Sequence, residues 1–173
     1  MNEIKLIKPS VEYADEIMKF RQELLDAESE FAGCGFLFNC KTGEEWIEKV
    51  ERNETSSCND VIITSSSYIA VRLRDNKIVG IIQLRHHIDH PVLGAWAGHI
   101  GYTVRPSERR KGYAKEMLRQ NLQHCRDRGL AKVLVGCDSD NIASEKTIVA
   151  NGGVFEKEIF ADGKMKKRFW INL

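Results

Sequence analysis

The chain has 173 residues, of which 42% are hydrophobic and 29% are charged, and this composition is ordinary for one globular domain. The formal net charge is +1, so we expect neither nucleic acid nor an anionic membrane as a partner. No apolar run approaches the roughly twenty residues that span a bilayer, and residues 1–6 lack the apolar core of a signal peptide. The five cysteines are scattered without a Cys-x-x-Cys pair, so we expect free thiols in a cytoplasmic protein.

The N-terminal part is predicted to hold one strand and two helices. Ser10 follows the strand and Pro9, and it is predicted as the N-cap of the first helix. Apolar side chains then recur every three or four residues, which is the spacing of one helical face, at Tyr13, Ile17, Phe20 and Leu24. The predicted elements are a strand at 3–8, a helix from Ser10, a loop at 26–43, a helix from Gly43 to about Arg52 and a mobile connection at 53–67.

The rest of the chain is predicted to contain six strands and two helices. Asp75-Asn76 is a hairpin signal, and Pro106 ends a strand because proline cannot continue a central strand. The predicted ranges are strands 68–73, 77–84 and 97–104, helix 112–128, strand 131–137, helix 141–151, and strands 154–160 and 165–171. The order β-α-α-β-β-β-α-β-α-β-β predicts one α/β domain over residues 1–173, with a mixed sheet of about seven strands.

The most informative segment is the turn that leads from the third of these strands into the helix at 112–128. A helix N-terminus presents unpaired N–H groups and attracts phosphate. Gly112 allows a ligand to approach the backbone closely. Several cations crowd this helix start, where they oppose the helix dipole, namely Arg109, Arg110, Lys111 and Lys115. The residues alone leave two alternatives open, an anion site and a solvated basic face.

Two motifs decide between these alternatives by resemblance. The pattern Val104-x-Pro106-x-x-Arg109-x-x-Gly112-x-Ala114 resembles motif A of the GNAT superfamily of acyltransferases. The segment Asn141-Ile-Ala-Ser144 is similar to the second signature of that family, and the order of elements resembles its complete core. The resemblance implies the GNAT acyl-CoA N-acyltransferase fold over residues 1–173. It also implies transfer of acetyl from acetyl-CoA to a primary amine of a small molecule, peptide or protein.

The resemblance also implies roles for individual residues. The backbone of Tyr102 and Val104 is expected to pair with the pantetheine arm, and Asn141 and Ser144 are expected beside it. The pyrophosphate is expected on Arg109, Arg110, Lys111, Gly112, Tyr113 and Ala114. Acetyl-CoA is therefore the expected co-substrate, an amine is the expected acceptor, and no metal is expected.

The catalytic positions depart from the family's pattern. Many members carry a glutamate where this chain has Gly98, and often a tyrosine acid where it has Ile148. The neighbouring His99 is a candidate general base, and a hydrogen-bonded core histidine is the equally weighted alternative. Tyr102 is a candidate catalytic residue, with packing as its alternative role. These departures keep a second function open, a non-catalytic acyl-CoA-binding module.

Two further groups of residues are candidate metal-binding or acceptor-binding sites. The histidine-rich loop lacks the spacing of a metal cage, so a role in acceptor binding is preferred to a metal site for His86, His87, Asp89 and His90. Acids and aromatics after the first helix would suit a cationic acceptor, with an ordinary acidic helix end as the alternative, at Asp26, Glu28, Glu30, Phe31 and Phe36. A homodimer is left open as the assembly.

Overall fold

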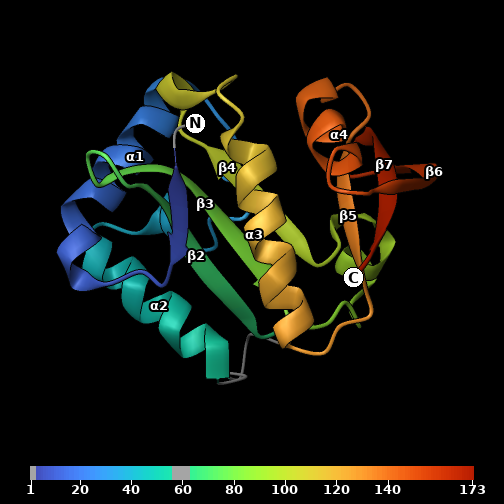
Figure 1. Ribbon diagram of the computed structural model, residues 1–173, viewed down its shortest axis with the longest axis horizontal. Coiled ribbons are helices and arrows are strands. Elements are labelled where there is room, and N and C mark those ends of the chain that lie inside the picture. Colours follow the sequence, from blue (N-terminus) through green and yellow to red (C-terminus); the bar gives the residue numbers. More distant parts are fainter. Residues whose placement is uncertain (1–2, 56–62) are drawn as a thin grey trace.

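The computed structural model describes residues 3–55 and 63–173. The order of its helices and strands is the predicted one (Figure 1). The elements are β1 (Ile4–Ile7), α1 (Ala14–Asp26), α2 (Gly43–Thr55), β2 (Ser65–Arg72), β3 (Lys77–Arg85), β4 (Ile100–Val104), α3 (Tyr113–Asp127), β5 (Lys132–Asp138), α4 (Ile142–Val149), β6 (Val154–Ala161) and β7 (Lys164–Asn172). Within the described ranges, no helix is long and apolar enough to cross a membrane.

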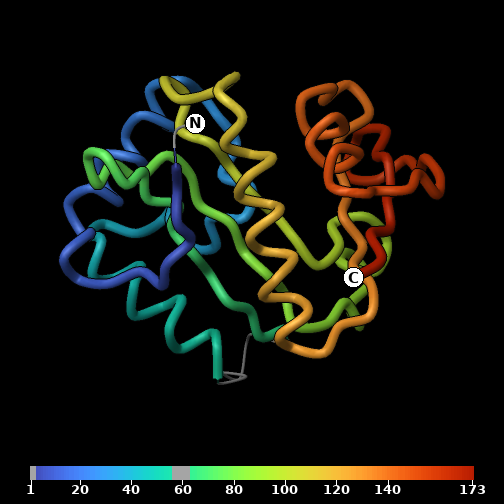
Figure 2. The backbone as a smooth tube through the Cα atoms, in the orientation of Figure 1, coloured from blue at the N-terminus to red at the C-terminus, as the bar shows by residue number. Residues whose placement is uncertain are grey.

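The seven strands form two antiparallel sheets, where one mixed sheet was expected. The first has the order β1-β2-β3-β4 and the second β5-β7-β6. Figure 2 separates them clearly, with the C-terminal part in orange and red to one side of the rest. The sheets meet where β5 approaches the start of β4, through an isolated bridge between Gly98 and Val135. The expected continuous sheet is therefore opened between its fourth and fifth strands.

Alternate residues of β2 and β3 point to opposite faces of the first sheet, and both faces are apolar and covered by helices. Ile69 and Val71 pack with α1 and α2, whose buried side chains include Phe20 and Trp46. On the other face, α3 contributes the buried residues Met117, Leu118, Leu122 and Cys125 to a second core. This second core also contains residues of β5 and β7, so α3 links the two sheets.

The connection predicted at 53–67 is wrong at both of its described ends. Helix α2 continues to Thr55, and Ser65, Ser66 and Ser67 form the start of β2. The buried hydroxyls of Ser65 and Ser66 are hydrogen-bonded to other side chains, whereas the buried Ser67 hydroxyl has no hydrogen-bond partner among the described residues. Asn53 Nδ2 donates to Ser65 Oγ at 2.6 Å, and Ser66 Oγ donates to a carboxylate of α2. The middle of the predicted connection, residues 56–62, lies outside the described residues.

Two other predicted boundaries also differ from the structure. The strand predicted from residue 97 begins only at Ile100, because residues 93–97 form a π-helical turn and Gly98 has a positive φ of 69°. Arg168 of β7 holds this turn by donating to the carbonyls of Gly94, at 2.6 Å, and Ala95. Ser10 does not cap α1, since a 3-10 turn comes first and the Ser10 hydroxyl donates to Glu12.

Candidate active site

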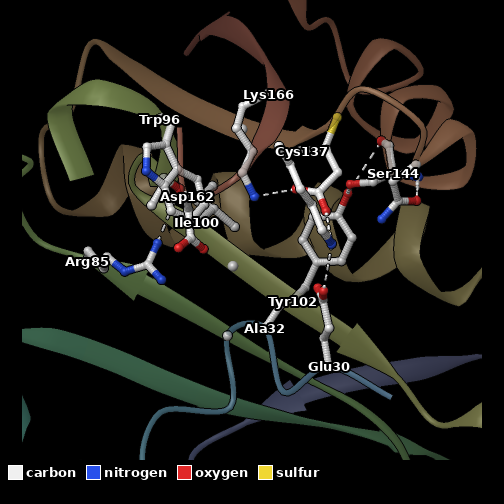
Figure 3. Close-up of a pocket in the computed structure, with 17 residues that line it drawn as sticks. Glu30, Ala32, Arg85, Trp96, Ile100, Tyr102, Cys137, Ser144, Asp162 and Lys166 are labelled. Carbon is white, nitrogen blue, oxygen red and sulfur yellow. Dashed lines mark hydrogen bonds and ion pairs between the residues drawn. The ribbon is translucent and has the colours of Figure 1, made fainter. Parts of the chain in front are cut away.

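The opening between the two sheets contains a cavity of about 370 Å³ (Figure 3). Its vertex lies beside the bridge between Gly98 and Val135, where the His99 N–H donates to the Leu134 carbonyl at 2.8 Å. Both strands line the cavity beyond this point, including Gly101 and Gly136. A side chain at Gly136 would collide with the Trp96 carbonyl, so the wall is closely packed there.

The backbone of β4 presents to this opening polar groups that β3 does not pair, and one of them, the Val104 carbonyl, accepts from Arg109. The Arg85 N–H donates to His99, and the Arg105 N–H donates back to β3, at the two ends of β4. Alternate residues of an antiparallel strand bond to the same neighbour. The residues between them, Ile100, Tyr102 and Val104, therefore direct their N–H and C=O groups away from β3 and toward the opening. This is the edge that was predicted to pair with a pantetheine arm.

His99 lies at the vertex of the opening and does not line the cavity. Its Nδ1 accepts a hydrogen bond from the Leu134 N–H at 2.9 Å, and the side chain is buried. Burial lowers the pKa of His99, although the Leu134 hydrogen bond works in the opposite direction. The imidazole of His99 thus takes the place of the backbone acceptor that the Leu134 N–H of β5 would have if β4 and β5 were paired there. This geometry favours the core-histidine alternative over the general base.

Replacement of His99 distinguishes these two roles. We expect His99→Ala to cost about 1–3 kcal/mol of unfolding free energy, because the buried Leu134 N–H loses its acceptor. His99→Asn offers an amide oxygen in nearly the same place, and it should restore much of the loss. Urea unfolding measures both. Turnover should fall by the same factor at every pH tested, whereas recovery of turnover at high pH would assign His99 the role of base.

Tyr102 and the start of α4 form one wall of the cavity. The Tyr102 hydroxyl lies 2.8 Å from Ser144 Oγ, and both residues line the cavity together with Asn141. Asn141 caps α4, because its Oδ1 accepts from the Ser144 N–H at 3.0 Å. Burial raises the pKa of Tyr102 to about 12, so the phenol stays protonated near neutral pH. The structure therefore brings these three predicted site residues together.

The predicted phosphate-binding turn lies immediately before α3 and outside the lining of that cavity. Gly112 has a φ of 83° and Arg110 a φ of 62°, so the turn requires left-handed conformations at two positions. A Cβ added at Gly112 would meet no atom within 4 Å, so the backbone there is open. Arg109, Lys111 and Arg110 are exposed, whereas the Tyr113 side chain is buried and Ala114 is half-buried.

Some of the cations in the turn have protein partners. Lys111 Nζ lies 2.8 Å from Glu108, and Arg109 donates to the Val104 carbonyl and to Ser29. In the part of the chain that the structure describes, Arg110 and Lys115 have no ion-pair partner. Partners within the protein therefore offset only part of the positive charge that the sequence places at this helix start.

Glu108 anchors the turn, and sequence reasoning missed it. Its carboxylate is buried and receives Arg72 at 2.8 Å, Lys77 at 2.9 Å and Lys111 at 2.8 Å. Burial alone would raise the pKa of Glu108, but the hydrogen bonds from these three cations lower it to about 2. Arg72 also donates to the Tyr113 hydroxyl at 3.2 Å. Glu108 therefore links the turn to β2 through Arg72 and to β3 through Lys77.

The loop after α1 contributes to the cavity at fewer residues than the sequence suggested. Glu30 lines the cavity, and it is joined there by Ala32 and Gly33. Gly33 lies so close to the backbone of Gly101 that any side chain would collide with it. Phe31 instead packs against the core beneath α1, and Phe36 is not part of the wall. The predicted aromatic wall is therefore absent from the described cavity lining.

Several cavity residues escaped sequence reasoning because they come from strands far apart in the chain. Asp138 of β5 pairs with Lys166 of β7 at 2.5 Å and with Lys164 at 2.9 Å. The Lys166 ammonium also lies 4.3 Å from the centre of the Trp96 ring. In the histidine-rich loop, both ring nitrogens of His86 are bonded to hydroxyl groups of residues 64 and 66. Those bonds occupy the atoms that a metal would need.

Comparisons with known proteins agree with this geometry. Residues 6–154 match the family model described as an acetyltransferase (GNAT) domain. No curated protein matches the chain.

Solved structures share the whole architecture at low sequence identity. MccE, a microcin self-immunity acetyltransferase in complex with acetyl-CoA and AMP, superposes with a TM-score of 0.69 at 19% identity, covering 100% of this chain and 94% of that one. RimL, a ribosomal-protein α-N-acetyltransferase in complex with CoA, gives 0.69 at 16% identity over 100% and 96% of the two chains. A chimera of the spermidine N-acetyltransferase SpeG from Vibrio cholerae and hSSAT gives 0.65 at 15% identity over 98% and 95%.

At these identities the structural likeness establishes the fold, whereas the family match covers most of the sequence. The seven strands, the opening between β4 and β5, and the glycine turn before α3 agree with that match. The chain is therefore a member of the GNAT acetyltransferase family and an acetyl-CoA-dependent acetyltransferase.

Proposed function

We propose that this protein transfers acetyl from acetyl-CoA to a primary amine, which attacks the thioester directly in a ternary complex. One observation carries the proposal. An open anion-binding turn, an unpaired strand edge and a cavity follow one another from α3 to the vertex of the opening. Together they offer a site for each part of a long acyl-CoA, with room left for an acceptor.

The turn before α3 is assigned to the pyrophosphate. Across residues 3–55 and 63–173, no acceptor is paired with the N–H groups of Arg110, Lys111 or Gly112. The first turn of α3 adds further free N–H groups and the positive end of its dipole. Arg110 and Lys115 supply positive charge and have no ion-pair partner among the described residues. The backbone of Tyr113 and Ala114 belongs to this cradle, although the Tyr113 side chain is structural.

The free edge of β4 is assigned to the pantetheine arm and the thioester. The backbone of Tyr102 and Val104 is oriented to pair with amide groups, and Asn141 and Ser144 line the same cavity beside Tyr102. A backbone N–H of β4 near the vertex, such as that of Ile100, would donate to the thioester oxygen as negative charge develops. Rigid placement by the β3 ladder pre-orients this donor.

The acceptor amine must lose a proton before it attacks. For a lysine-like amine this costs about 4.6 kcal/mol at pH 7. His99 faces β5 rather than the cavity, so a base role for it would require a chain of water molecules. The carboxylates that line the cavity are those of Glu30, Asp138 and Asp162. Asp138 is paired with Lys164 and Lys166, and Glu30 lies 3.4 Å from Lys164. Asp162, which has no ion-pair partner among the described residues, is therefore the side chain best placed to attract a protonated amine.

We assign Tyr102 the role of hydrogen-bond donor to the departing thiolate. Full proton transfer from a phenol with a pKa of about 12 to a thiolate with a pKa of about 8.5 is uphill by about 5 kcal/mol. Tyr102→Phe should lower kcat about tenfold, the value of one such hydrogen bond, and leave the KM for acetyl-CoA nearly unchanged. Steady-state kinetics test this, with Tyr13→Phe, outside the cavity, as the control. An unchanged kcat would remove Tyr102 from the reaction.

The alternative is a module that binds acyl-CoA without catalysis. It is supported by Gly98 and Ile148, which stand where the family's pattern often has catalytic side chains. Two measurements separate the alternatives. Thermal unfolding with and without CoA reports binding, and thiol release from acetyl-CoA in the presence of a panel of amines reports transfer. We expect both signals. Protection by CoA with no thiol release from any amine would support the binding module.

The single domain, the cytoplasmic location, the homodimer and the lack of nucleic-acid or membrane partners stay predictions. Sedimentation velocity at several protein concentrations would determine the assembly. A monomer at every concentration would rule out the homodimer.

A further inference from the structure

Arg85 places a guanidinium at the cavity. It ends β3, and its Nη1 donates to the carbonyls of Ala97, at 3.3 Å, and Gly98, at 3.0 Å. These bonds hold the Nη1 end of the guanidinium in place, because both carbonyls belong to the turn that ends where the two sheets meet. Its Nε and Nη2 atoms make no hydrogen bond to any described residue. A rigidly held cation therefore keeps donors free for a ligand.

Arg85 is half-buried, and the absence of a carboxylate partner distinguishes it from the buried arginines among the described residues. Arg72, Arg105 and Arg168 are each paired with at least one acidic side chain. Within the described residues, no carboxylate oxygen lies within 4 Å of Arg85. A guanidinium that is partly withdrawn from water, with no carboxylate at ion-pair distance, costs free energy that a bound anion would offset. Burial accordingly lowers the pKa of Arg85.

Its position separates Arg85 from the groups assigned to the pantetheine arm and places it at the same end of the cavity as Ile100, whose N–H is proposed to face the thioester. Figure 3 shows Tyr102, Cys137 and Ser144 toward one end of the cavity, and Arg85 and Trp96 toward the other. The first end adjoins α4 and the free edge of β4, where the pantetheine arm is proposed to lie. A ligand group that reaches Arg85 would therefore belong to the acceptor.

The charges at the cavity favour a carboxylate over a phosphate. A phosphate dianion would require a second cation, but the other cations that line the cavity, Lys164 and Lys166, are both paired with Asp138. The planar fork of one arginine matches one carboxylate. Asp162 supplies negative charge for an ammonium group in the same cavity, whereas Glu30 is paired with Lys164 at 3.4 Å. The volume of about 370 Å³ is small for a site that also admits a thioester.

We infer that the acceptor is a small amine that also carries a carboxylate, as an amino acid does, and that Arg85 binds this carboxylate. The inference rests on the proposed function, because it identifies the class of acceptor. Arg85 would hold the acceptor by its acid group and leave the amine free to face the thioester. It is thus a specificity-determining residue.

The first test compares free α-amino acids with their carboxamides as acceptors, using six pairs of differing side chain. The wild-type protein should favour the acids by about tenfold to a hundredfold in kcat/KM, the value of a charge-assisted hydrogen bond. Basicity cannot produce this preference, since the amides have the less basic amine and contain more of the neutral form. Arg85→Gln should abolish the preference with an unchanged KM for acetyl-CoA, and Arg85→Lys should retain part of it. Arg126→Gln, exposed on α3, is the control. Preference for the amides, or preference for the acids that survives in Arg85→Gln, would overturn the inference.

The second test measures binding alone, so that it gives an answer even without turnover. Calorimetry with the CoA-saturated protein compares N-acetyl amino acids with N-acetyl amino-acid amides. The acids should bind the wild type and lose at least about tenfold in affinity in Arg85→Gln. This result with no thiol release would support the inference while contradicting the proposed transfer. Equal binding of acids and amides, or no binding of either, would overturn the inference. Thermal unfolding of each variant confirms that it is folded.

Discussion

Replacement of Gly112 by aspartate should abolish binding of CoA while leaving the fold intact. A Cβ at this position meets no protein atom within 4 Å, so the added side chain has space in the free protein. It would, however, place a carboxylate against the pyrophosphate. At about 4 Å and an effective dielectric constant of about 20, one such repulsion costs about 4 kcal/mol, or roughly a thousandfold in affinity. Titration calorimetry with CoA measures the loss.

Two further variants isolate the effect of charge at Gly112. Gly112→Asn has the same shape and the same positive φ as the aspartate variant, and asparagine tolerates that conformation. It should therefore bind CoA much more tightly than Gly112→Asp does. Gly129→Asp puts the same change at the other end of α3, where φ is 79° and the space is also open. It should bind CoA like the wild type. Wild-type affinity in Gly112→Asp would refute the assignment of the turn.

Replacement of Glu108 by glutamine should give the largest loss of stability among the variants considered. The change leaves Arg72, Lys77 and Lys111 close together without their shared counter-charge. Loss of one partner from a buried ion pair typically costs about 3–5 kcal/mol. Because Lys111 and the turn are fastened through Glu108, CoA should also bind more weakly. Urea unfolding at pH 7 measures the first effect and calorimetry the second.

The dependence on pH gives an independent test of Glu108. Its pKa is lowered from an ordinary value of 4.5 to about 2, so the unfolded chain takes up a proton before the folded chain does. The stabilisation is fully present above about pH 4.5 and is lost as the pH falls toward 2. Glu108→Gln should therefore lose less stability than the wild type over this interval. Glu116→Gln removes an exposed ion pair with Arg119 and should cost under about 1 kcal/mol. Equal losses in the two variants would refute the anchoring role.

Local patterns were sufficient to predict the elements and the phosphate-binding turn. Helical spacing located α1 and α3, and the glycine and proline of the turn marked the passage from β4 into α3. The conformation of Gly112 was predictable because only a few residue types adopt a positive φ without strain. Glu108 lies inside the same turn but was missed. Its partners Arg72 and Lys77 are 36 and 31 residues away in sequence, and only the folded sheet brings them together.

The shape of the cavity was not predictable, because it depends on how two strands part. The sequence 97–104 has a strand pattern throughout, yet Arg168 holds residues 93–97 in a helical turn from a distant strand. His99 then serves as a hydrogen-bond acceptor for β5, and no local pattern separates that role from a base. Arg85 likewise ends an ordinary strand, and its significance lies in the absence, among the described residues, of a carboxylate oxygen within 4 Å of it. Ser65 and Ser66 of β2 were misread for the same reason, because their partners lie elsewhere in the chain.

A crystal structure of the protein with CoA tests the central claim most directly. We predict that the pyrophosphate oxygens lie within about 3.2 Å of backbone N–H groups between Arg110 and Ala114. The pantetheine arm should follow the free edge of β4 past Tyr102, with the thiol inside the cavity of about 370 Å³. A CoA molecule bound elsewhere, with the turn before α3 unoccupied, would contradict the account.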